Sequence, residues 1–124
     1  MKALLIIAHG SRVDDSAGVM ERLASKLKGM GRYDLAEVAY VQFQQPGIGE
    51  AVARLVERGA KEIVAVPAFL FRGVHVTRDI PGELKVSKDA HPGVKIFLAE
   101  PIGYDERICE ILAERAAGEV VEIS

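Results

Sequence analysis

Apolar residues recur along the chain in alternating strand-like and helix-like patterns. Ala3 to Ala8 is apolar throughout, which is typical of a strand covered on both faces in a parallel sheet. From Val19 to Met30 the apolar residues recur at helical spacing instead. The alternation continues along the chain, which predicts strands over 35–43, 62–70 and 94–100 and helices over 48–56, 79–90 and 105–117.

Four strand–helix units in succession predict an α/β fold with one parallel sheet and helices on both of its faces. The expected strand order is second, first, third, fourth, which is half of a doubly wound, flavodoxin-like sheet. A chain of 124 residues is long enough for one sizeable core and too short for two. We therefore expect a single domain over residues 1–124.

Two histidines follow the first and third predicted strands, in HGSR at 9–12 and FRGVH at 71–75. In an open parallel sheet, ligands bind outside the carboxyl ends of the strands where the strand order reverses. That reversal lies between these two strands. A histidine at a strand end is commonly an ordinary hydrogen-bonded residue, but His9 and His75 are expected to face each other at the position that the fold favours for a ligand.

Composition narrows the function further. A net charge of −2 gives no electrostatic argument for binding nucleic acid or an anionic membrane. No apolar run approaches the roughly 20 residues of a membrane span, and the first ten residues lack the cleavage site of a signal peptide. The single cysteine, Cys109, excludes an internal disulfide and fits a reducing cytoplasm. Its place in a helical pattern predicts a buried structural thiol.

Several kinds of site are excluded by their motifs. The sequence has no GxSxG elbow for a hydrolase, and no phosphate-binding GxxxxGK[ST] or GxGxxG loop. A closed structural zinc site requires four ligands, typically including several cysteines, which this chain does not supply. An open site with imidazole ligands remains, and such a site suits a divalent ion that is captured and then released.

The stretches LLIIAHGSR, FQQPGI, AVPAFLFRGVHVTRDIP and LAEPIG follow one another in this order. Together they resemble the small CbiX proteins among the class II chelatases, from Lys2 to about Arg115. These proteins insert a divalent metal into the tetrapyrrole sirohydrochlorin in cobalamin biosynthesis. The resemblance implies cobalt as the metal substrate, with nickel or iron as alternatives, and no nucleotide cofactor. It also implies a cytoplasmic homodimer in which each subunit resembles half of a two-domain chelatase.

The resemblance assigns a role to each matching residue. His9 matches the histidine that binds the metal and accepts the pyrrole protons, and His75 matches the second metal ligand. The residues expected to contact the tetrapyrrole are Gln45, Leu70, Phe71, Arg72, Gly73 and Val74. Residues expected to support the site are Ser11, Arg12, Gln42 and Arg78.

The residue types suit these roles. Imidazole can bind a metal or accept a proton close to neutral pH. The apolar run Phe69 to Phe71 offers a wall to a flat conjugated ring, and Gly73 permits close approach of the backbone. Arginine binds carboxylates in a two-pronged fashion, so Arg72, Arg12 and Arg78 are candidate partners for the carboxylates of sirohydrochlorin.

One departure from the family pattern affects proton removal. Relatives have a glutamate near the proline of the second stretch, whereas VQFQQP has Gln42, Gln44 and Gln45. Glutamine cannot bind a metal as a carboxylate or remove a proton. More of the proton transfer then falls on His9, or on Glu100 or Asp79. A non-catalytic module that delivers a metal or tetrapyrrole is the alternative, and phosphoryl transfer through His9 is a weaker one.

Overall fold

The sheet of the computed structural model consists of four parallel strands within the described residues, which are 1–12, 15–73 and 78–123. Their order is β2-β1-β3-β4, and all neighbouring pairs are parallel. The strands are β1 (Lys2–Ala8), β2 (Leu35–Tyr40), β3 (Glu62–Pro67) and β4 (Lys95–Leu98). The predicted α/β class and strand order are confirmed.

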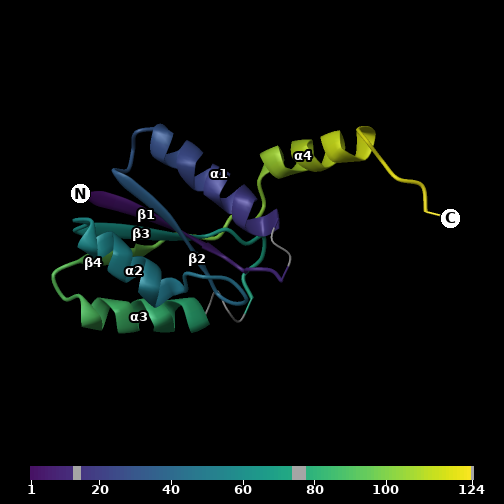
Figure 1. Cartoon of the computed structure of the whole chain (residues 1–124). Helices are drawn as coiled ribbons and strands as arrows, with labels where there is room; N and C mark the ends of the chain where they lie inside the picture. Colours follow the sequence, from purple (N-terminus) through teal and green to yellow (C-terminus); the bar gives the residue numbers. More distant parts are fainter. Residues whose placement is uncertain (13–14, 74–77, 124) are drawn as a thin grey trace.

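Helices alternate with the strands along the chain. They are α1 (Asp15–Gly29), α2 (Ile48–Glu57), α3 (Ile80–Ala90) and α4 (Glu106–Ala117). In Figure 1, α1 lies on one face of the sheet and α2 and α3 lie on the other. The prediction of helices on both faces is therefore confirmed. In the described part of the chain, every helix is too short or too polar to cross a bilayer.

β1 forms the centre of the core because both of its faces are covered. Ala3, Leu5 and Ile7 belong to the buried cluster that includes residues of α2 and α3. The intervening residues Leu4, Ile6 and Ala8 belong to the buried cluster on the α1 side. Successive side chains of a strand point to opposite faces. This two-sided burial explains why residues 3–8 of the strand are all apolar.

The first three strands end at the same edge of the sheet. Ala8 at the end of β1 pairs with Tyr40 at the end of β2, and Ile7 pairs with Pro67 at the end of β3. The segments that follow, beginning at His9, Val41 and Ala68, therefore leave this carboxyl edge side by side. This is the edge at which the sequence places a ligand.

β2, β3 and β4 end at Tyr40, Pro67 and Leu98, two or three residues earlier than the apolar pattern predicts. The amides of Val41 and Gln42 donate to the carbonyls of Ala8 and His9 at 3.0 and 3.1 Å, but the strand stops at Tyr40. Phe43 has a positive φ of 65°, which breaks the extended conformation. The apolar residues after Tyr40 thus form a loop at the carboxyl edge.

α4 differs from the other helices because it buries none of its twelve residues, all of which are described. Figure 1 shows it beyond the end of the sheet, with the C-terminal segment leading further away. Cys109 on this helix is exposed, so the prediction of a buried thiol is wrong for the single chain. The helical pattern predicted the helix correctly but could not show that it buries no residue in its own chain. The C-terminal segment forms neither helix nor strand over 120–123.

Candidate functional site

His9 lies immediately after β1, where the strand order of the sheet reverses. Its imidazole stacks on the ring of Phe69, with 3.9 Å between the ring centroids and 19° between the ring planes. Phe69 is only 3% exposed, whereas His9 is exposed. A surface histidine is thus supported by an aromatic ring that belongs to the core.

The loops after β1 and β2 are bound to each other around His9. The carbonyl of His9 accepts a hydrogen bond from the amide of Gln42 at 3.1 Å. Two residues further along each loop, the amide of Ser11 donates to the side-chain Oε1 of Gln44 at 2.7 Å. Ser11, predicted to support the site, contacts the loop after β2 through its backbone amide. Gln44 has a structural role here, while Gln42 and Gln45 present exposed side chains.

Gly10 makes the close approach of these two loops possible. Its φ is +88°, a conformation that other residues rarely adopt. A Cβ at this position would lie 1.8 Å from the carbonyl oxygen of Gln42, which is backbone and cannot rotate away. Glycine is therefore required next to His9, for reasons of conformation and of space.

Arg12 lies over the ring of Phe43 in the neighbouring loop. The guanidinium carbon is 4.7 Å from the ring centroid, which is the geometry of a cation–π interaction. Phe43 is 56% exposed, so this pair lies at the surface of the site. The stack orders the arginine without using its hydrogen-bond donors, which leaves them suited to an anionic group of a ligand.

The loop after β3 is described only in part. Leu70, Phe71, Arg72 and Gly73 are all exposed, as expected of residues that contact a ligand. A Cβ at Gly73 would meet no atom within 4 Å. Val74 and His75 lie outside the described residues, so the expected meeting of His75 with His9 stays a prediction.

Two of the predicted arginines form ion pairs within the chain. Arg72 pairs with Glu100, which follows β4, and both side chains are largely exposed. Arg78 Nε lies 3.3 Å from Oδ1 of Asp79. A ligand carboxylate that binds Arg72 would therefore compete with Glu100, and one that binds Arg78 would compete with Asp79. The same pairs involve the two acids that were considered as alternative proton acceptors.

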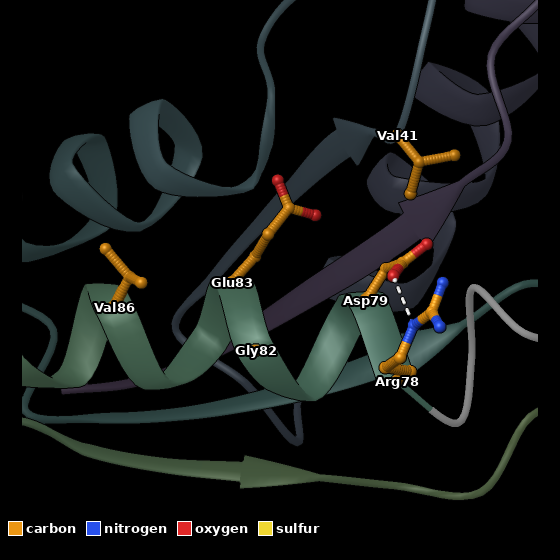
Figure 2. A pocket seen from close by; sticks show the side chains of 6 residues that line it. All are labelled: Val41, Arg78, Asp79, Gly82, Glu83 and Val86. Carbon is orange, nitrogen blue, oxygen red and sulfur yellow. Dashed lines mark hydrogen bonds and ion pairs between the residues drawn. The ribbon is translucent and has the colours of Figure 1, made fainter.

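A pocket of about 630 Å³ lies between the end of β2 and the first turns of α3. Figure 2 shows Asp79 and Glu83, at the start of α3, extending toward the side of the pocket where Val41 follows β2. Val41 adjoins Gln42, whose amide binds the carbonyl of His9. The pocket therefore borders the loops that hold His9. The full set of lining residues is Val41, Arg78, Asp79, Gly82, Glu83 and Val86.

A second, more apolar groove lies between the loop after β3 and α4. We call it the α4 groove; its volume is about 350 Å³, and its lining residues are Leu70, Phe71, Gly103, Tyr104, Asp105, Ile108, Cys109 and Leu112. The groove brings Leu70 and Phe71, which were predicted to contact a tetrapyrrole, together with α4, which buries none of its residues in its own chain. The sequence motifs did not indicate this contact.

Titratable groups near these sites are perturbed in two places. Burial raises the pKa of Tyr40, and the nearby charge of Glu21 raises it further, so the phenol stays neutral well above neutral pH. Hydrogen bonds from the side chain and amide of Arg107 lower the pKa of Asp105 at the start of α4. Among residues 1–12, 15–73 and 78–123, no group of three or more His, Cys, Asp or Glu residues is arranged to hold a metal ion.

The family model described as CbiX matches residues 3–119, which is nearly the whole chain. This chain belongs to the CbiX family. A CbiX relative from Sulfurisphaera tokodaii, named sirohydrochlorin cobaltochelatase, is 42% identical over 115 residues, covering 93% of this chain and 91% of that protein. The resemblance seen in the sequence motifs is therefore confirmed.

Two solved structures share the fold of this CbiX chain. The sirohydrochlorin chelatase SirB from Bacillus subtilis subspecies spizizenii, in complex with cobalt, matches with a TM-score of 0.86 and 28% identity. SirB from Bacillus subtilis with Fe3+ matches with a TM-score of 0.82 and 29% identity. The matches cover 94% and 92% of this chain but only 50% and 45% of the SirB chains. This chain thus corresponds to about half of a SirB chain.

The sequence patterns did not identify three residues that shape the site. Phe69 was grouped with Leu70 and Phe71 as a wall for the ligand, but it points into the core beneath His9. Buried and partly buried residues alternate along β3, and Phe69 continues this alternation two residues after the buried Pro67. This period of two residues was the available signal. Phe43 and the requirement for Gly10 had no signal in the pattern, because both depend on how the loops after β1 and β2 meet.

Proposed function

We propose that this CbiX chain is a sirohydrochlorin chelatase that inserts a divalent metal into the tetrapyrrole. The main support is His9, an exposed imidazole on a buried aromatic support at the edge where the strand order reverses. Exposed Leu70 and Phe71 at the same edge supply an apolar surface for a flat ring. The names of its relatives agree with this activity.

In this proposal His9 presents the metal to one face of the macrocycle and accepts pyrrole protons. A neutral imidazole nitrogen can do either, but one nitrogen cannot do both at once. Metal transfer to the ring therefore frees the nitrogen, which can then accept the two pyrrole protons one after the other and release each of them to solvent. His75 is proposed as the second ligand, with water at the remaining positions.

Recognition of the substrate carboxylates is assigned to the arginines around His9. Arg12 is ordered by its stack on Phe43 with its donors available. Arg72 and Arg78 can exchange Glu100 and Asp79 for a substrate carboxylate at small cost, because exposed ion pairs contribute about 0–1 kcal/mol each. Gln42 and Gln45 are exposed and can donate hydrogen bonds to the tetrapyrrole.

Cobalt is the proposed metal, and nickel and iron are the alternatives. Imidazole suits all three ions, so the two histidines do not select among them. The cobaltochelatase name of the Sulfurisphaera relative favours cobalt. We place the reaction in the cytoplasm, where Cys109, the only cysteine of the sequence, would stay reduced.

The active form is proposed to be a homodimer of single-domain subunits. Each chain matches about half of SirB, so a second copy can take the place of the other half. The surfaces available for this contact are the α4 groove and the exposed apolar residues around it. Such residues are costly to leave in water as a contiguous patch. Phe71 and Leu112 line the groove, and Ile111 is exposed on the same helix.

The direct test is an insertion assay with sirohydrochlorin and each metal in turn. The purified apoprotein should accelerate the absorbance change of metal insertion above the uncatalysed rate, most strongly with cobalt. A protein that binds both the metal and the tetrapyrrole without exceeding that rate would be a delivery module instead. Hydrolysis of a generic phosphate ester that persists with a chelator would indicate phosphoryl transfer.

A further inference from the structure

We propose that Phe69 is a positioning residue that holds the imidazole of His9 in the orientation used for metal binding. This inference rests on the proposed role of His9 in the chelatase reaction. The two rings are 3.9 Å apart between centroids and 19° from parallel, so one face of the imidazole lies against the phenyl ring. No motif of the sequence had assigned a role to Phe69 beyond an apolar wall.

The phenyl ring is itself held by the core. Phe69 is 3% exposed and belongs to the same buried cluster as Ile7 and Ile80. The residue before it, Ala68, donates its amide to the carbonyl of Ile7 at 2.8 Å, which fixes the chain where it leaves the sheet. The support under His9 therefore has the rigidity of the core, although His9 lies at the surface.

A stack of this kind leaves metal binding open to the imidazole. The lone pair that binds a metal lies in the plane of the ring and points outward from its edge, whereas the stack occupies a face. Without a ring against this face, additional orientations become open to the exposed imidazole. If only a fraction of these orientations can bind, the apparent dissociation constant rises in inverse proportion to that fraction. The stack therefore tightens metal binding by restricting the imidazole.

The burial of Phe69 separates this role from tetrapyrrole binding. A side chain that is 3% exposed offers almost no surface to a second substrate, whereas Leu70 and Phe71 are exposed. Loss of the phenyl ring should consequently affect the metal and spare the tetrapyrrole. A general loosening of the fold would affect both substrates.

The stack can be tested first by NMR, without any activity measurement. The sequence has three histidines, so the imidazole protons of His9 can be assigned by their absence in His9→Ala. Ring current from Phe69 should shift these protons upfield, and Phe69→Leu should abolish the shift. Leu84→Val is the matched control, because Leu84 is buried in the same cluster, and it should retain the shift. Equal His9 shifts in the wild type and Phe69→Leu would overturn the proposal.

Kinetics of metal insertion provide the second test. Phe69→Leu should raise the KM for the metal by roughly 3- to 10-fold and leave the KM for the tetrapyrrole unchanged, with the rate recovering at high metal concentration. Phe69→Tyr retains an aromatic face and should stay closer to the wild type than Phe69→Leu. An unchanged metal KM, or equal increases for both substrates beyond those in Leu84→Val, would overturn the positioning role. Full activity of His9→Ala would instead contradict the proposed function.

Discussion

His9 acquires a defined position from three neighbours, of which two are distant in the sequence. Phe69 supports its ring, the amide of Gln42 binds its carbonyl, and Gly10 beside it allows that contact. Phe69 lies in the loop after β3, Gln42 lies in the loop after β2, and Gly10 lies in the turn after β1. The chemistry of the histidine is common, but its placement depends on all of these contacts.

Gly10→Ala should lower both stability and the rate of insertion. A side chain at φ +88° is strained by about 1–2 kcal/mol, and its Cβ would force the carbonyl of Gln42 away. The loss of this contact would displace His9 relative to the loop after β2. The measurements are the thermal unfolding midpoint and the insertion rate of the folded variant.

Gly49→Ala provides the comparison for this change. Gly49 is exposed in α2, and a Cβ there would meet no atom within 4 Å. Alanine favours a helix more than glycine, so this variant should be as stable as the wild type or more so. A Gly10→Ala protein that matched Gly49→Ala in both measurements would show that the close approach is not required.

The secondary-structure elements were largely predictable, and the loops between them were not. Burial on both faces makes β1 apolar from Ala3 to Ala8, and the helices follow a 3.6-residue period. Val41 and Phe43 extend the apolar pattern of β2, so their turn into the site had no local signal. The exposure of Cys109 likewise depends on what covers α4, which the periodicity of one helix does not specify. The sequence placed His9 and Leu70 at the correct edge because topology alone determines it.

At the scale of elements, α4 depends on its first turn because it buries none of its residues in its own chain. Asp105 caps the helix by accepting a hydrogen bond from the amide of Arg107 at 2.9 Å, and the guanidinium of Arg107 binds the same carboxylate. Asp105→Ala should therefore reduce the protection of the α4 amides in hydrogen exchange. Asp89→Asn removes an exposed ion pair with Lys85 and should leave α4 unchanged.

Acid should loosen α4 in the wild-type protein in the same way. The bonds from Arg107 lower the pKa of Asp105 below its usual value of about 3.9. The stabilisation of α4 by the Asp105 carboxylate is therefore fully present above that value, and it is lost as the pH falls through the lowered pKa. Hydrogen exchange of α4 as a function of pH should show this loss in the wild type but not in Asp105→Ala. An identical pH dependence in both proteins would contradict the capping role.

At the scale of the molecule, the proposed dimer should depend on α4. Leu112 is 64% exposed in the α4 groove, and a lysine there would place a charge in the proposed interface. Leu112→Lys should weaken the dimer by at least about tenfold, which corresponds to roughly 1.4 kcal/mol. Sedimentation velocity over a range of concentrations measures this change. Met30→Lys, at a position that is 61% exposed at the end of α1, should leave the dimer intact. A wild-type protein that is a fully active monomer at micromolar concentration would contradict the dimer.

His9 at the carboxyl edge of β1 is proposed to insert the metal into the tetrapyrrole. This role is tested by the initial rate of insertion by His9→Ala, with cobalt and sirohydrochlorin both in excess. Since the removed imidazole is exposed, the variant should stay folded. Its rate should fall to that of the uncatalysed reaction, because no other described side chain is proposed to present the metal. A folded His9→Ala protein that retains the wild-type rate would contradict the account.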